Sequence, residues 1–217
     1  VLSGITFSDK AAINLKLKDK AKATWAIHGD VGGGWSWQPE GAIWDGELFA
    51  MAVMSSFQNM TTFRTNNTGE NLSSSGTDFF ASRRETGQSR YIDVALPGVP
   101  SLNDKRTLFN RSFLFSTNNL WKLKNGELKA NIDYSFNHVT AQATNITTYF
   151  LEDGNRVITE QHDGSERTHS LSGKLIYELN KKTAFINNTL QTDIDWNNIN
   201  LQTAGSLLNT QSADLPD

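Results

Sequence analysis

The chain has 217 residues, 20 basic and 23 acidic side chains, a net charge of −3 and no cysteine. The lack of thiols excludes a disulfide scaffold and thiolate-bound zinc or iron–sulfur sites. The near balance of charges argues against nucleic acid as a partner, because that would need clustered Lys and Arg. A polar chain with 10% aromatic residues and only 4 prolines is typical of a β-protein with one hydrated face.

Alternation of apolar and polar residues is the main secondary-structure signal, and no segment keeps a helical apolar stripe. The alternation predicts strands over residues 12–18, 25–31, 44–57, 111–124, 127–138, 167–179 and 184–196. It is most regular in the fifth of these, where Leu128, Ile132 and Phe136 share one face and Glu127 and Asp133 the other. The sequence therefore predicts an all-β, antiparallel meander of long strands.

Turn signals separate these runs. Asn125-Gly126 predicts a type I′ hairpin turn, which needs positive φ at both central residues. Three further turns are predicted at Asp153-Gly154, at Asp163-Gly164 and over residues 180–182.

A long loop is predicted from Thr65 to Arg106, a stretch that contains Asn-Asn, Ser-Ser-Ser-Gly and Pro-Gly-Val-Pro. Such a loop is rare in a compact soluble domain but ordinary at one rim of an outer-membrane barrel. Segments 140–167 and those beyond 197 are expected on the same rim, with the short turns on the other. Several predicted strands exceed the roughly 9–11 residues that cross a bilayer. This favours a partial transmembrane β-barrel, with a soluble β-sandwich as the alternative, since alternation alone does not separate them.

Several segments are similar to one family in pattern. They are residues 12–18, Trp25 with the glycine-rich 29–34, and the strand segments 110–112, 118–123, 131–134 and 171–175. Residues 12–18 (Ala-Ile-Asn-Leu-Lys-Leu-Lys) resemble the end of the plug domain, and the others the first barrel strands, of Bacteroidetes-type TonB-dependent outer-membrane receptors. The resemblance implies a fragment, with residues 1–19 as the plug end and residues 20–217 as the N-terminal part of the barrel.

The resemblance also implies a function without catalysis or a cofactor. The parent protein would import a scarce nutrient across the bacterial outer membrane, and a glycan is one candidate nutrient. Its partners would be outer-membrane lipid, TonB acting through the missing plug, and a surface lipoprotein as a further candidate. The 65–106 loop is the best candidate for ligand recognition, on its length and position alone.

Three tryptophans, Trp35, Trp37 and Trp44, are the candidate ligand-binding residues. Indole faces stack on sugars, so a soluble extracellular β-sandwich that binds carbohydrate would use them. In a barrel they would instead belong to the aromatic girdle at the membrane interface, which the barrel interpretation favours.

The histidines and acidic residues give weaker hypotheses. His28 and His138 lie in no metal-binding motif. His162 and His169 are expected in a loop, where they could form a surface metal site, but we favour the interpretation that they are ordinary solvated residues.

Asp193 and Asp195 share one strand face, where Asp133 is expected to join them. Paired carboxylates can hydrolyse glycosides, but a lumen-facing charge network is the favoured interpretation. The sequence therefore predicts no catalytic, metal-binding or cofactor-binding residue.

Overall fold

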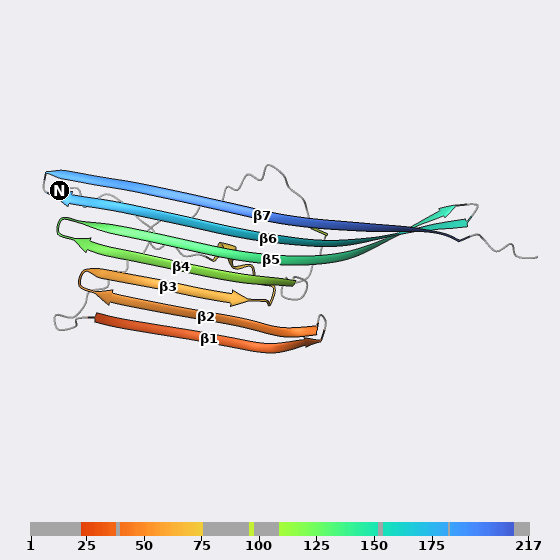
Figure 1. Cartoon of the computed structure of the whole chain (residues 1–217), viewed down its shortest axis with the longest axis horizontal. Coiled ribbons are helices and arrows are strands. Elements are labelled where there is room, and N and C mark those ends of the chain that lie inside the picture. The colour runs from red at the N-terminus through yellow and green to blue at the C-terminus, as the bar shows by residue number, and fades with distance from the viewer. Residues whose placement is uncertain are drawn as a thin grey trace, which may run out of the picture.

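A computed structural model describes residues 23–37, 40–75, 96–97, 109–151, 154–181 and 183–210. These residues form one antiparallel sheet of seven strands, each paired with its neighbours in the chain (Figure 1). The strands are β1 (Ala23–Trp37), β2 (Glu40–Met54), β3 (Phe57–Asn66), β4 (Phe109–Leu123), β5 (Gly126–Leu151), β6 (Gly154–Lys181) and β7 (Ala184–Thr210). A single 3-10 turn, η1 (Leu72–Ser74), follows β3. The predicted all-β antiparallel meander is confirmed, and within the described residues the sheet stays open because β1 and β7 are not paired.

The last three strands are much longer than the first four. β5, β6 and β7 have 26, 28 and 27 residues, whereas β1, β2 and β4 have 15 each. They continue together past the ends of the other strands (Figure 1). Segments 140–167 and those beyond 197, which we expected on the rim with the long loops, are therefore strands wherever the structure describes them. These polar, Thr- and Asn-rich segments pair with one another as strands even where both faces are exposed.

The connections at one end of the sheet are all short. β2–β3, β4–β5 and β6–β7 turn at this end, which we call the tight-turn end, and β1–β2, β3–β4 and β5–β6 turn at the far end (Figure 1). Strand 44–57 of the prediction is divided here by the turn at Ser55-Ser56, and β3 begins at Phe57. The long connection after β3 begins at residue 67, two residues later than predicted.

The β4–β5 hairpin is where the sequence predicts it, but its turn is not type I′. Leu123 pairs with Gly126, so the loop residues are Lys124 and Asn125. No non-glycine residue among those described has positive φ, and Gly126 is not among the positive-φ glycines. Gly126 is explained by a close approach instead, since a Cβ there would collide with the Glu178 carbonyl on β6.

Asp163-Gly164 was expected to form a turn, and this prediction is wrong because both residues lie inside β6. Gly164 leaves room for residues of the β3–β4 connection that pack on the sheet. A Cβ at this position would lie 2.8 Å from Pro97 Cδ and 2.9 Å from Leu96 Cδ2. Glycine thus allows the β3–β4 connection to approach the sheet backbone.

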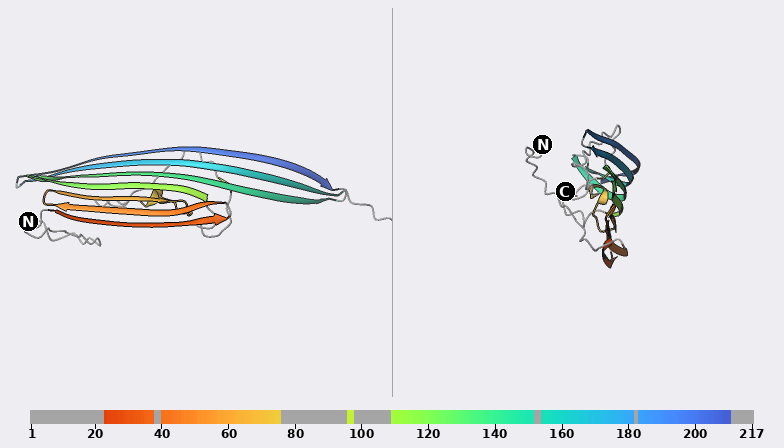
Figure 2. Two further views of the ribbon diagram at one scale, coloured as in Figure 1. Left: turned by 60° about the horizontal axis from the view of Figure 1, so that its bottom comes forward. Right: turned by 90° about the vertical axis from the view of Figure 1, so that its left-hand side faces the viewer.

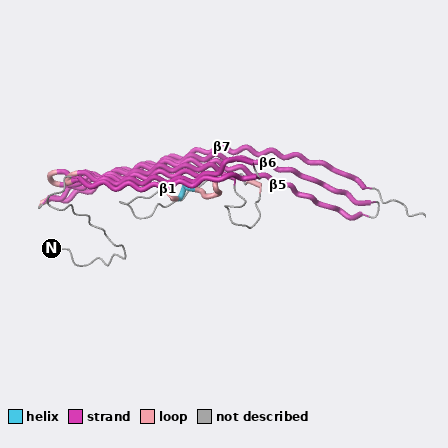
Figure 3. Tube along the Cα trace, turned by 90° about the horizontal axis from the view of Figure 1, so that it is seen from below, coloured by secondary structure: helices cyan, strands magenta, loops and turns pink. Residues whose placement is uncertain are grey.

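Seen from one end, the sheet is curved (Figure 2). Edge-on, the described part of the β3–β4 connection lies against one of its faces (Figure 3). The predicted strand 12–18 and plug segment 1–19 lie outside the described residues.

Candidate functional site

The two faces of the sheet differ in composition. Directly paired residues in an antiparallel sheet project to the same side, so the register assigns each side chain to a face. Phe63, Phe115 and Tyr134 belong to one side, which we call the apolar face. Leu114 and Ser135 belong to the other, the polar face.

Aliphatic residues on the apolar face form a band that aromatic residues border at both ends. The tight-turn end carries Phe57 and Trp121, whose ring centroids are 5.6 Å apart. The band between the borders contains Leu48, Ala50, Ala130, Ile132, Leu171, Leu175, Leu190 and Ile194. On β5 the apolar stretch extends from Leu128 to Phe136, which is nine residues.

The far border of this band is a continuous chain of ring contacts, which we call the ring row. It joins Phe63, Phe113, Tyr134, His169 and Trp196, one from each strand from β3 to β7. The His169 and Trp196 rings are stacked, with centroids 5.1 Å apart and planes 8° apart. The Tyr134 hydroxyl lies 2.9 Å from His169 Nδ1, which fixes the imidazole in this row.

A polar cluster interrupts the apolar band between β3 and β4. Asn59 pairs with Asn119 and Thr61 with Thr117, so all four project from the apolar face. Asn59 Nδ2 donates to Asn119 Oδ1 at 2.8 Å and to Thr117 Oγ1 at 3.2 Å. The Thr61 hydroxyl donates to Asn59 Oδ1 at 3.2 Å. Mutual hydrogen bonds reduce the cost of placing these groups in apolar surroundings.

On β4 and β5, burial is the reverse of that in a soluble sheet. On β5, Ile132 is 46% exposed, whereas the next residue, Asp133, is only 3% exposed. The buried residues of β4 and β5 are mostly polar and lie on the polar face: Asn110, Ser112, Ser116, Asn118, Asn131, Asp133, Ser135 and Asn137. On these two strands the apolar face is the more exposed one.

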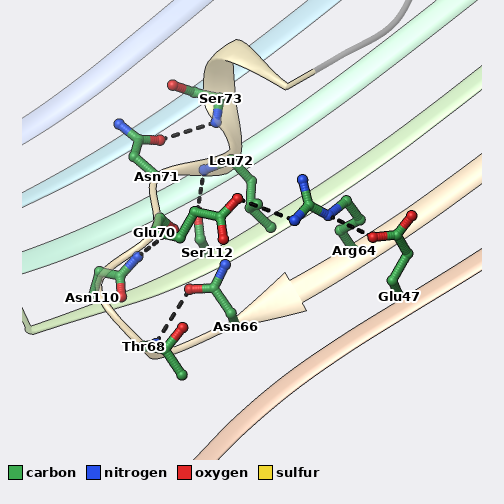
Figure 4. Close-up of polar contacts among 10 residues, drawn as sticks. All are labelled: Glu47, Arg64, Asn66, Thr68, Glu70, Asn71, Leu72, Ser73, Asn110 and Ser112. Carbon is green, nitrogen blue, oxygen red and sulfur yellow. Dashed lines mark hydrogen bonds and ion pairs between the residues drawn. The ribbon is translucent and has the colours of Figure 1, made fainter. Parts of the chain in front are cut away.

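Part of the polar face is covered by residues 67–75, which we call the strap (Figure 4). Asn110 on β4 holds the strap backbone twice, because its Nδ2 donates to the Glu70 carbonyl and its Oδ1 accepts from the Gly69 N–H, both at 2.8 Å. The Leu72 N–H donates to Ser112 Oγ at 3.1 Å. The Leu72 side chain is 1% exposed, so the strap is anchored by both hydrogen bonds and packing.

An arginine ties the strap to β2 and β3 (Figure 4). Arg64 Nη2 lies 3.0 Å from Glu70 Oε1, and Arg64 Nε lies 3.2 Å from Glu47 Oε2. Arg64 therefore bridges a carboxylate of the sheet and a carboxylate of the strap.

Three basic residues lie directly beyond the ring row on the apolar face. Arg111 pairs with His138, and His138 pairs with Arg167, so the three form one row across β4, β5 and β6, which we call the basic row. Both arginines are exposed. Burial, followed by the positive charges of Arg167 and Arg111, lowers the pKa of His138 below its usual 6.5. Alternation could have indicated this row, because each member lies two residues beyond a ring-bearing residue of the same face. These residues are Phe113, Phe136 and His169.

The three candidate tryptophans lie on the apolar face near the far end of β1 and β2. Trp44 is opposite Gly33, and Trp35 is the next residue along that face of β1. The Trp44 Nε1–H donates to Thr65 Oγ1 at 3.3 Å, while Trp37 is 82% exposed. Their role as ligand-binding residues stays a prediction.

The structure separates the histidines that a metal site would need. His162 and His169 both lie within β6 and not in a loop. They are seven residues apart, an odd number, so they project from opposite faces of the sheet. In contrast, Asp133, Asp193 and Asp195 do share the polar face, because Ser172 pairs with both Asp133 and Asp193.

Within the described residues, no helix has the length and apolar character needed to cross a membrane.

Comparison of the chain with protein-family models, curated proteins and solved structures found no match.

Proposed function

We propose that this chain is part of a transmembrane β-barrel that takes up a nutrient through the bacterial outer membrane, as its resemblance to TonB-dependent receptors implies. In this proposal the apolar face contacts lipid and the polar face lines the lumen. A parent protein would supply the plug, through which TonB acts, and the remaining strands. A glycan as cargo and a surface lipoprotein as partner belong to the same proposal.

The observation that supports the proposal best is the reversed burial. In a soluble sheet protein the apolar face packs on a core and the polar face meets water. Here Ile132 is exposed while Asp133 beside it is buried, and the strap covers part of the polar face. A lipid environment removes the cost of the exposed apolar side chains, which water would impose.

The dimensions of the apolar face support the same proposal. The stretch from Leu128 to Phe136 is close to the roughly 9–11 residues of a tilted membrane strand. Aromatic rings border the aliphatic band at both ends, as they do at the two interfaces of a membrane barrel. The extensions of β5, β6 and β7 would stand outside the membrane.

The alternative, a carbohydrate-binding β-sandwich, requires a second sheet over the apolar face. All seven described strands belong to one sheet, so the observations favour the barrel.

Single cysteines test the proposal cleanly, because the chain has none of its own. A fluorophore would be placed at Ile132 and Ser135, which project from opposite faces of β5, with the protein in bilayers containing brominated lipid. We expect the bromolipid to quench the label at Ile132 and to leave the label at Ser135 unaffected.

The matched control is Gln142, which projects from the same face as Ile132 but lies beyond the ring row. Its label should be quenched by a water-soluble agent and not by bromolipid. Equal behaviour of Ile132 and Gln142, or full solubility of the intact parent without detergent, would overturn the membrane assignment.

A further inference from the structure

We propose that the basic row, Arg111, His138 and Arg167, binds the phosphate group of an anionic lipid headgroup at the outer surface of the bilayer. The inference rests on the proposed function, because it takes the apolar face as the lipid-facing one. It adds a specific ligand class to a surface that would otherwise contact only acyl chains.

The three side chains of the row lie side by side on neighbouring strands. The two arginines flank His138 on neighbouring strands, all on one face. Strands are spaced by about 4.8 Å, so the arginine backbones lie about 10 Å apart. Two guanidinium groups can therefore reach a single phosphate above the imidazole from both sides, and arginine suits the bidentate recognition of phosphate oxygens.

The charge of the site fits an anion. Asn198 continues the row on β7, so the row contains no carboxylate. The nearest acid on the same face of β6 is Asp163, four residues from Arg167, while Glu166 projects to the polar face. His169 is the next titratable group toward the tight-turn end, and it is held in the ring row.

The pKa of His138 agrees with this placement of the two arginines. Burial, followed by repulsion from the positive charges of Arg167 and Arg111, lowers its pKa. An anion bound over the row would offset that repulsion and favour the protonated imidazole.

The height of the row identifies a lipid as the source of the phosphate. The basic row lies one pleat beyond the ring row, where the aliphatic band ends. Aromatic rings lie at the headgroup level of a membrane. Side chains directly beyond them are therefore placed beside lipid phosphates, which are held there at high local concentration.

The test compares the chain in nanodiscs of phosphatidylglycerol and of phosphatidylcholine, with NMR of labelled His138 as the first readout. We expect the pKa of His138 to be higher in phosphatidylglycerol. Native mass spectrometry of the chain released into detergent gives the second readout. The variant Arg111→Ala/Arg167→Ala should retain phosphatidylglycerol at least roughly tenfold less well, as expected for the loss of charge-assisted hydrogen bonds.

The matched control is Arg156→Ala, which removes a positive charge from the polar face of β6 and should change neither readout. Inorganic phosphate added to phosphatidylcholine nanodiscs distinguishes a soluble anion. If it raises the pKa of His138 as much as phosphatidylglycerol does, the lipid assignment is overturned.

Normal insertion with no effect of the double arginine variant would overturn the basic row as a lipid site while leaving the proposed function intact. Failure of the chain to enter either nanodisc, together with unquenched Ile132, would overturn both.

Discussion

At the scale of single residues, hydrogen-bond satisfaction decides which polar groups the apolar face tolerates. Asn59 is the centre of the polar cluster, since its amide donates to Asn119 and Thr117 and its oxygen accepts from Thr61. The cluster is thus a single unit, and its parts are not independent.

We expect Asn119→Leu to lower the free energy of unfolding by about 1–3 kcal/mol, because it removes an acceptor of the Asn59 amide. The double variant Asn59→Leu/Asn119→Leu should recover part of this loss, since both partners are then apolar. Urea unfolding in bilayers measures both. Simple addition of the two single-variant effects would contradict the coupling.

His138 makes stability depend on pH. Its pKa in the folded protein is below 6.5, so the unfolded chain binds more protons as the pH falls through that value. The free energy of unfolding is therefore unaffected by His138 above about pH 6.5 and decreases below it. We expect His138→Gln to lose less stability than the wild type between pH 7.5 and 5.5 in zwitterionic detergent. An identical pH dependence of the two proteins would show that the shift is absent.

At the scale of elements, the strap is the part of the β3–β4 connection whose position the contacts explain. The carboxylate of Glu70 and the backbone of Gly69 are bound to Arg64 and Asn110, which belong to different strands. Leu72 then fills the space against β4 and β5. The Asn110 anchor is not visible as a local motif, because it joins residues about 40 positions apart.

We expect Arg64→Met to loosen the strap without unfolding the sheet, because the carboxylates of Glu47 and Glu70 lose their common cation. Hydrogen exchange at the amides of Gly69 and Leu72 should accelerate about tenfold. The amides of β5 serve as the internal control. If they accelerate equally, Arg64 stabilises the whole sheet and does not specifically hold the strap.

At the scale of the whole molecule, the reversed burial predicts that stability depends on the surrounding solvent. Ile132 is half exposed and at mid-height of the band. In a bilayer, Ile132→Arg should cost about 2–4 kcal/mol, whereas Thr144→Arg, on the same face beyond the ring row, should cost about 0–1 kcal/mol. Urea unfolding in lipid measures both, and equal costs would argue against a membrane band.

The described part of the molecule also leaves two strand edges free, on β1 and β7. Free edges are templates for further pairing. The extension of β5, β6 and β7 is exposed on both faces over much of its length. Its polar side chains suit contact with water on both faces, and its edges suit pairing with further strands.

Period-two alternation by itself determined most of the fold. It predicted the strands around Trp25, Leu128, Leu171 and Ile194, because alternation follows directly from the geometry of a strand. The Asn125-Gly126 turn signal added the hairpin between two of the strands. It also placed Asp133, Asp193 and Asp195 on one face. Alternation did not predict where strands end, since Thr- and Asn-rich segments resemble loops in composition. For that reason the 140–167 hairpin and the interior position of Asp163-Gly164 were missed.

Only the tertiary structure decided which residues meet and which face is covered. The basic row, the ring row and the polar cluster depend on cross-strand register, which joins residues as distant as Asn59 and Asn119. A shift of one residue would move each side chain to the opposite face. Likewise, alternation is the same whether the apolar side is buried or bare. The strap is bound to the polar face through Asn110 and Ser112. Its position shows which face is covered, and only a segment that folds back onto the sheet can provide such a cover.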